Sequence, residues 1–229
     1  MLPMLCAALL FVVAHLGVSS TGVRAKWVAK LGEQGYLGVF SLLALLTLGL
    51  LIWTYTSVPR HVYWWPLDPA LYLVPKLLMP IALILAVGGF MVRNPTTVGM
   101  EGTLADPEQA DRAVRGVNRI TRHPFQWGVI LWALAHVIAN PDAVSVIFFA
   151  AFLALSGLGT VLLDRKKAAA IGAAWQPFAQ RTSNVPFLAV VAGRNRLVLR
   201  ELVAPVVAGL VVYALLFWGH QWVSGVRII

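Results

Sequence analysis

Six long apolar segments restrict this sequence to one class of fold. They cover approximately residues 2–19, 36–57, 71–92, 124–140, 143–163 and 203–223. These lengths approach or exceed the roughly 18–20 residues that a helix needs to cross a bilayer. Within a bilayer the backbone must satisfy its own hydrogen bonds, which a continuous helix does. The pattern therefore predicts an all-α, polytopic transmembrane bundle of about six spans.

The composition agrees with this class. Hydrophobic residues make up 59% of the chain and charged residues 12%, with a mean hydropathy of +0.79, whereas soluble domains are about 45–50% apolar and about 25% charged. The first segment lacks the basic start and the small-residue cleavage site of a signal peptide, so we expect it to be a span. No soluble domain can be separated, and residues 1–229 are expected to form a single integral membrane domain.

The net charge of +9 is concentrated in three loops. Fifteen of the 18 Lys and Arg residues lie in segments 20–35, 93–123 and 164–202. Basic residues are retained on the cytoplasmic side of a membrane, so these three loops are predicted to be cytoplasmic and both termini to be on the outer side. Because this distribution explains the charge, we do not expect binding to nucleic acid.

Local signals predict how the spans are joined. Asp106 and Pro107 form a helix start, from which an amphipathic helix is expected to lead into the fourth span. The turn at Asn140-Pro141-Asp142 predicts that the fourth and fifth spans form an antiparallel hairpin. Gly172 is expected to end or bend the helix that continues the fifth span.

Ionisable side chains inside a span are costly and mark candidate functional sites. His15, Lys76 and His136 are such residues. Lys76 lies near the start of its span, where its side chain can reach the interface. For His15, two interpretations remain open: a hydrogen bond between helices, or a ligand or catalytic group.

His136 shares a helix face with Trp132, Gly128 and Asn140. Gly128 leaves space, Trp132 offers a flat wall and His136 offers a lone pair, which together suit a planar cofactor such as haem. The same pattern suits close helix packing, since small residues let helices approach. Both interpretations stay open at this point.

Other cofactor and enzyme classes lack support in the sequence. A single cysteine, Cys6, excludes an intrachain disulfide and a multi-cysteine metal site. HExxH, P-loop and Rossmann glycine patterns are absent from the sequence. Two histidines on different helices can still coordinate one metal through neutral ring nitrogens.

Three motifs give the chain a family resemblance. They are AHLGVSSTGVRAKWVAKLGEQGYLGVFSL near the start, ITRHPFQWGVILWALAH from residue 120, and DRKKAAAIGAAWQPFAQRTSNVPF from residue 164. In this order they resemble the NnrU family of bacterial membrane proteins, associated with denitrification, whose close relative is the plant 15-cis-zeta-carotene isomerase. The resemblance implies a multi-pass protein of the bacterial inner membrane.

The resemblance to the isomerase also implies haem b. Its iron would be a cofactor held by His15 and His136, with His123 as a substitute ligand. Where the isomerase has a cysteine, this chain has Ala133, so a thiolate ligand is excluded there. Candidate partners for the haem propionates are Arg119, Arg122 and Arg165.

Two functions follow from this family. In one, His15 and His136 serve a haem-dependent cis/trans isomerase of a lipid-soluble polyene. In the other, the protein is an accessory or sensor in nitric oxide metabolism, where the haem meets NO. The oligomeric state is not predicted.

A more distant similarity links the chain to isoprenylcysteine carboxyl methyltransferase-like membrane enzymes. It rests on an Arg-His-Pro motif entering one span and an acidic residue ending the next. This similarity implies a surface for S-adenosylmethionine, to which six residues would contribute: Arg122, His123, Asp164, Arg165, Trp175 and Arg181. A membrane methyltransferase is therefore the third candidate function.

Overall fold

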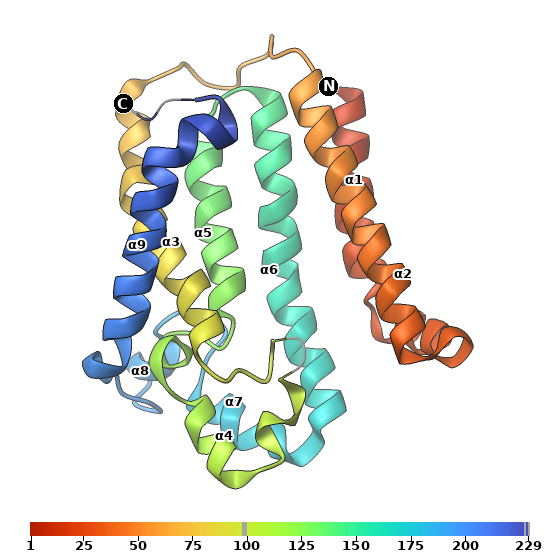
Figure 1. The fold of residues 1–229 in the computed structure, drawn as a ribbon, viewed down its shortest axis with the longest axis vertical. Coiled ribbons are helices and arrows are strands. Elements are labelled where there is room, and N and C mark those ends of the chain that lie inside the picture. The colour runs from red at the N-terminus through yellow and green to blue at the C-terminus, as the bar shows by residue number, and fades with distance from the viewer. Residues whose placement is uncertain (98–99, 227, 229) are drawn as a thin grey trace. The chain divides into compact units, whose positions relative to one another are not determined.

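The structure describes residues 1–97, 100–226 and 228, and helices make up most of them (Figure 1). This computed structural model confirms the all-α class, and the described residues form no strand, only an isolated bridge between Tyr63 and Asp142. The α-helices are α1 (Leu2–Val18), α2 (Thr21–Ser57), α3 (Leu73–Met91), α4 (Pro107–Ala113), α5 (Pro124–Ala139), α6 (Ala143–Ile171), α7 (Trp175–Arg181), α8 (Leu188–Val191) and α9 (Leu199–Ser224).

Each of the six predicted spans coincides with a helix. Among the described residues, four helical stretches are long and apolar enough to cross a membrane: Gly22–Ser57, Pro69–Met91, Ala143–Arg181 and Leu199–Ser224. The other two predicted spans are shorter apolar helices, α1 with 17 residues and α5 with 16. Four candidate spans are thus found, and six spans with both termini outside stay a prediction.

The helices belong to two compact units. Unit 1 consists of residues 1–75 and 133–162, and unit 2 of residues 76–132 and 163–229. The boundaries fall inside α3, α5 and α6, so each of these helices contributes residues to both units.

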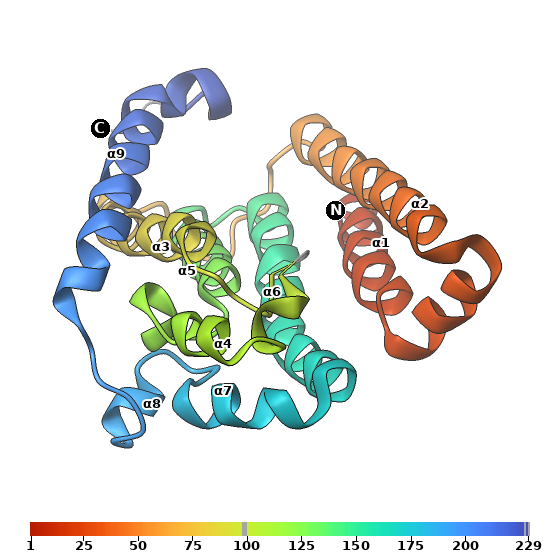
Figure 2. The ribbon, with the colours of Figure 1, turned by 60° about the horizontal axis from the view of Figure 1, so that its bottom comes forward.

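In unit 1, α1 and α2 form a helical hairpin, visible in both ribbon views (Figures 1 and 2). α2 contains a kink at Gly32, whose φ of 71° is not helical. The loop after α2 is tied to the Asn140-Pro141-Asp142 turn by two backbone bonds, from the Trp64 amide to the Pro141 carbonyl at 2.9 Å and from the Ala143 amide to the Val62 carbonyl at 2.9 Å. The predicted tight turn between α5 and α6 is confirmed.

In unit 2, α3 packs closely against α5 and α9. A Cβ atom on Gly128 of α5 would lie 2.7 Å from the Ala82 carbonyl oxygen of α3, and one on Gly209 of α9 would lie 2.6 Å from the Ile84 Cα. Only glycine permits such approach, because any side chain would meet helix backbone. The small residues therefore act as packing contacts between helices.

The segments outside the spans form a small core of their own in unit 2. Figure 2 shows α4 beside α7, and Ala113 and Val114 are buried there with Trp175 and Phe178. Asp106 caps α4 as predicted, since its Oδ1 accepts a bond from the Glu108 amide at 2.9 Å.

The predicted long amphipathic helix after Asp106 is wrong in its extent. α4 ends at Ala113, and a separate 3-10 turn follows at Gly116–Arg119, because Gly116 takes a positive φ of 54°. Gly172, also at positive φ, ends α6 as predicted.

Candidate functional site

His15 lies in the last turn of α1, half-buried in unit 1. Its Nδ1 is 2.7 Å from the Phe11 carbonyl oxygen. A carbonyl can only accept, so Nδ1 carries the proton and donates it. In the neutral ring, Nε2 then holds the lone pair. A metal-binding histidine is commonly oriented in this way by a backbone carbonyl.

His136 lies near the end of α5, in the part of that helix that belongs to unit 1. Its ring stacks at a tilt on Phe149 of α6, with 4.8 Å between ring centroids. His15 in turn lies 4.4 Å from the ring of Phe11. Both predicted ligands are therefore in the same unit and both contact phenylalanine.

A series of ring contacts connects the two histidines. The rings in order are His15, Phe11, Phe152, Phe148, Phe149 and His136, with centroid distances of 4.4, 5.1, 5.3, 5.1 and 4.8 Å. The ring contacts between the two histidines are thus all with phenylalanine side chains.

Gly128 and Trp132 lie on α5, eight and four residues before His136, and the boundary between the units falls between Trp132 and His136. Both belong to unit 2. The space beside Gly128 is filled by Ala82 and Ala86 of α3. Of the two interpretations of Gly128, this contact supports helix packing. Trp132, half-buried, lies four residues before His136 in α5.

The Arg-His-Pro motif supplies a second polar centre, at the start of α5 in unit 2. Asp164 of α6 accepts hydrogen bonds from Arg122 Nε at 2.8 Å and from a second Arg122 nitrogen at 2.7 Å, and its Oδ1 lies 2.8 Å from His123 Nε2. The guanidinium is thus held in two-point contact, which is stronger than a single bond. This arrangement brings together three residues that the methyltransferase resemblance grouped.

His123 is fully buried, and its Nδ1 has no hydrogen-bond partner within the described residues. Since Nε2 donates to the Asp164 carboxylate, the lone pair of the neutral ring is on Nδ1. The Asp164 carboxylate binds both Arg122 and His123, so this centre is a polar contact between the start of α5 and α6.

Hydrogen bonds join the TRHP motif to the TSNVPF motif. The Arg122 amide donates to the Ser183 carbonyl at 2.9 Å, and the Thr121 hydroxyl and the Trp127 indole both donate to the Asn184 carbonyl, at 2.6 and 2.8 Å. Two segments that are about sixty residues apart therefore form one polar junction.

The sequence did not identify the residues that complete this junction. The buried side chains of Asn94 and Thr96 both donate to the Arg122 carbonyl, at 3.0 Å each, and Asn94 also contacts Asn118 at 3.1 Å. The sequence Arg93-Asn94-Pro95 predicts only a turn. These partners of Asn94 and Thr96 are more than twenty residues away in the sequence, so a local pattern does not predict them.

The remaining predicted residues belong to unit 2, whereas His15 and His136 belong to unit 1. Arg119 is paired with Glu201, with 2.7 Å between Nε and Oε2, and Arg181 with Asp111 at 2.6 Å. Arg165 is exposed. Trp175 is buried in the core between α4 and α7, where it packs and does not line an open surface.

Two histidines are enough protein ligands for a haem iron and too few for a closed zinc site. The described residues contain no group of three or more His, Cys, Asp or Glu side chains that could hold a metal ion. Two neutral imidazoles complete the coordination of a haem iron, because the porphyrin supplies the other four ligands, whereas zinc needs more protein ligands.

Comparisons with known proteins agree with the sequence motifs. Two relatives, each named 15-cis-zeta-carotene isomerase, chloroplastic, are 28% identical to this chain: the protein from Zea mays over 85% of this chain, and that from Arabidopsis thaliana over 84%. The chain spans about half the length of these curated relatives, 52% and 51%. No solved structure matches.

The match to a protein family extends over the entire architecture described above. The family model described as NnrU protein matches residues 3–228. This range includes α1 with His15, α5 with His136, and the polar junction between the TRHP and TSNVPF motifs. The chain therefore belongs to the NnrU family.

Proposed function

We propose that this protein is a membrane isomerase that changes the cis/trans geometry of a lipid-soluble polyene of the zeta-carotene class. The names of the two isomerase relatives support the reaction class. The four apolar helices support a location in the bilayer, where such a polyene dissolves. The localisation that we propose is the bacterial inner membrane, with the three basic loops in the cytoplasm.

His15 and His136 are the residues proposed to hold haem b. The main support for this ligand assignment is the hydrogen bond from His15 Nδ1 to the Phe11 carbonyl, which leaves the lone pair on Nε2, where a metal can bind. When bound, the haem would supply a redox-active iron in an apolar setting. The phenylalanines around the two rings would exclude water and offer flat, apolar contacts to a conjugated chain.

A spectrum of the detergent-purified protein tests the ligands. We expect the unmodified protein to show a reduced b-type spectrum, and both His15→Ala and His136→Ala to lose or shift it. His61→Ala is the matched control, because His61 is exposed in the loop after α2. Unchanged spectra in both site variants would contradict the assignment. Loss of the spectrum in His123→Ala alone would indicate the substitute ligand.

The reaction is tested in a host that accumulates zeta-carotene. Expression of the unmodified protein should change the isomer ratio measured by chromatography, and the His15→Ala variant should not. An unchanged ratio with haem present would contradict the isomerase and leave the accessory role in nitric oxide metabolism. A colourless, folded protein that binds S-adenosylmethionine would instead support the methyltransferase.

A further inference from the structure

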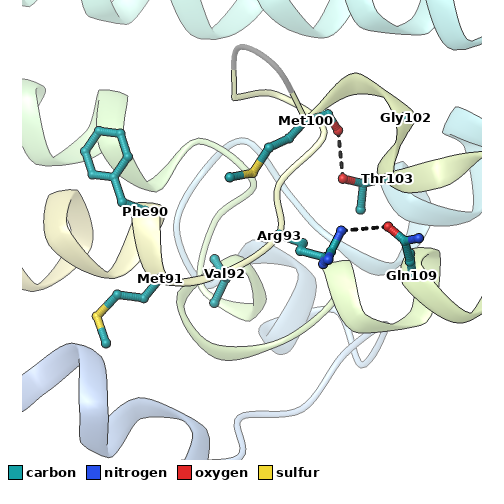
Figure 3. Close-up of a pocket in the computed structure, with 8 residues that line it drawn as sticks. All are labelled: Phe90, Met91, Val92, Arg93, Met100, Gly102, Thr103 and Gln109. Atoms are coloured by element: carbon teal, nitrogen blue, oxygen red, sulfur yellow. Dashed lines mark hydrogen bonds between the residues drawn. The ribbon is translucent and has the colours of Figure 1, made fainter.

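An open pocket of about 610 Å³ lies at the end of α3 in unit 2, away from the proposed haem ligands in the sequence. Its lining residues, all labelled in Figure 3, are Phe90, Met91, Val92, Arg93, Met100, Gly102, Thr103 and Gln109. One side is apolar and comes from the helix end. The other side is polar and comes from the segment before α4 and from α4 itself.

The apolar side continues the exposed surface of a candidate span. Phe90 is 61% exposed and Met91 47% exposed at the point where α3 ends. Leu77 and Ile81 are exposed earlier on the same helix. Phe90 also meets Phe125 edge-on, with 5.2 Å between ring centroids. Acyl chains that cover α3 would therefore reach the rim of the pocket.

The polar side presents a guanidinium that is held in place. Arg93 donates to Gln109 Oε1 at 2.7 Å, as Figure 3 shows, and Gln109 Nε2 donates to Asp106 Oδ2 at 3.0 Å. The bond from Gln109 lowers the pKa of the Asp106 carboxyl, with the Glu108 amide adding to the effect. Asp106 thus remains an ionised acceptor and keeps the Gln109 amide oxygen turned towards Arg93.

Arg93 differs from the other arginines nearby in the charge of its partner. Arg112, Arg115, Arg119, Arg122 and Arg181 are each paired with a carboxylate. Arg93 has a neutral amide partner, and no carboxylate of the described residues forms an ion pair with it. Its positive charge is therefore available to an anion in the pocket, and the planar guanidinium suits the two oxygens of a phosphate.

We infer that this pocket binds an anionic phospholipid, with the headgroup phosphate on Arg93 and the acyl chains along Phe90 and Met91. An amphiphile matches both sides of the pocket, whereas a free anion would leave the apolar rim unused. Anionic lipids are also those that basic residues at a membrane surface attract. The inference depends on the membrane location proposed above and is independent of haem and of isomerase activity.

Binding of short-chain lipids to the detergent-purified full chain tests this site. The probes are phosphatidylglycerol and phosphatidylcholine of equal chain length, and inorganic phosphate, each titrated with tryptophan fluorescence as the readout. The unmodified protein should bind phosphatidylglycerol on the order of fivefold more tightly than phosphatidylcholine, because the choline ammonium offsets the phosphate charge beside Arg93. Inorganic phosphate, which has no acyl chains, should bind more weakly than phosphatidylglycerol. R93Q should lose this preference. R112Q, which removes an equal charge outside the pocket, should keep it.

Three results would overturn the inference. Equal binding of the two lipids to the unmodified protein would show that headgroup charge is not recognised, and this comparison holds even if R93Q fails to fold. Phosphate binding as tight as that of phosphatidylglycerol would indicate a simple anion site. A preference that survives in R93Q would place the site elsewhere.

Discussion

A single carboxylate, that of Asp164, holds the polar centre of unit 2 together. It neutralises Arg122 through two nitrogens and accepts from the buried ring of His123. The side chains of Arg122 and Asp164 are only 14% and 20% exposed, so water cannot replace the carboxylate fully. Removing one member of such a pair leaves a charge with poor solvation.

Asp164→Asn should therefore be strongly destabilising, by about 3–5 kcal/mol. The neutral amide presents an NH2 group to the guanidinium and no longer compensates its charge. Thermal unfolding in detergent, followed by tryptophan fluorescence, measures the loss as a fall in Tm. The control is Asp111→Asn, whose ion pair with Arg181 is 76% and 47% exposed and should contribute less than about 1 kcal/mol. Equal Tm values for the two variants would contradict the role given to Asp164.

At the level of the helices, contact distance decides where a side chain is tolerated. Gly209 of α9 lies against the backbone of α3, and a helix backbone cannot move aside as a flexible side chain can. By contrast, a Cβ on Gly157 of α6 would have no atom within 4 Å. Both glycines lie inside helices, so the comparison separates packing from helix propensity.

Gly209→Ala should destabilise the protein by about 1–3 kcal/mol through overpacking. Gly157→Ala should leave the stability unchanged or raise it by up to about 1 kcal/mol, since alanine is the better helix former. The Tm of each variant, measured in the same detergent, checks this. A neutral Gly209→Ala would mean that α9 does not approach α3 as closely as described.

Local signals predicted the helices well, because apolar length and turn residues act over a few neighbours. The Asn140-Pro141-Asp142 turn and the end of α6 at Gly172 are confirmed for this reason. The resemblance to methyltransferases, not periodicity, grouped Arg122 and His123 with Asp164. The Asn184 carbonyl, which accepts from Thr121 across 63 positions, could not be predicted. It is a backbone atom, and its partner is set by tertiary folding.

Gly128 is a second case in which tertiary folding, and not the local sequence, decides the role of a residue. A small residue four positions before a tryptophan suits either a cofactor or a neighbouring helix. Which one fills the space depends on α3, about forty residues away in the sequence, and the structure shows Ala82 and Ala86 there. The aromatic contacts between His15 and His136 were likewise not predicted, since Phe11 and Phe152 meet only through folding.

At the scale of the whole molecule, the number of spans determines which loops share a side of the membrane. If α1 and α5 cross in addition to the four longer candidates, loops 20–35, 93–123 and 164–202 are all on one side. If α1 and α5 do not cross, loop 164–202 lies opposite to loop 93–123. The distribution of basic residues favours the first arrangement.

Single cysteines in a Cys6→Ser background test this topology. We expect cysteines at Asn140 and His61 to react with an impermeant maleimide in intact cells. Cysteines at Glu108 and Arg194 should react only after the cells are opened. Labelling at Arg194 but not at Asn140 in intact cells would contradict six spans and support four.

The division of α5 and α6 between the two units has a consequence for the order of synthesis. Unit 1 needs residues 133–162 in addition to residues 1–75. At about 5–20 residues per second, the α1–α2 hairpin is synthesised roughly 4–17 s before the ribosome reaches α6, whose Phe152 contacts Phe11 of α1. During that interval the hairpin lacks the residues of α5 and α6 that complete unit 1. Neither unit can be obtained by truncating the gene at one point.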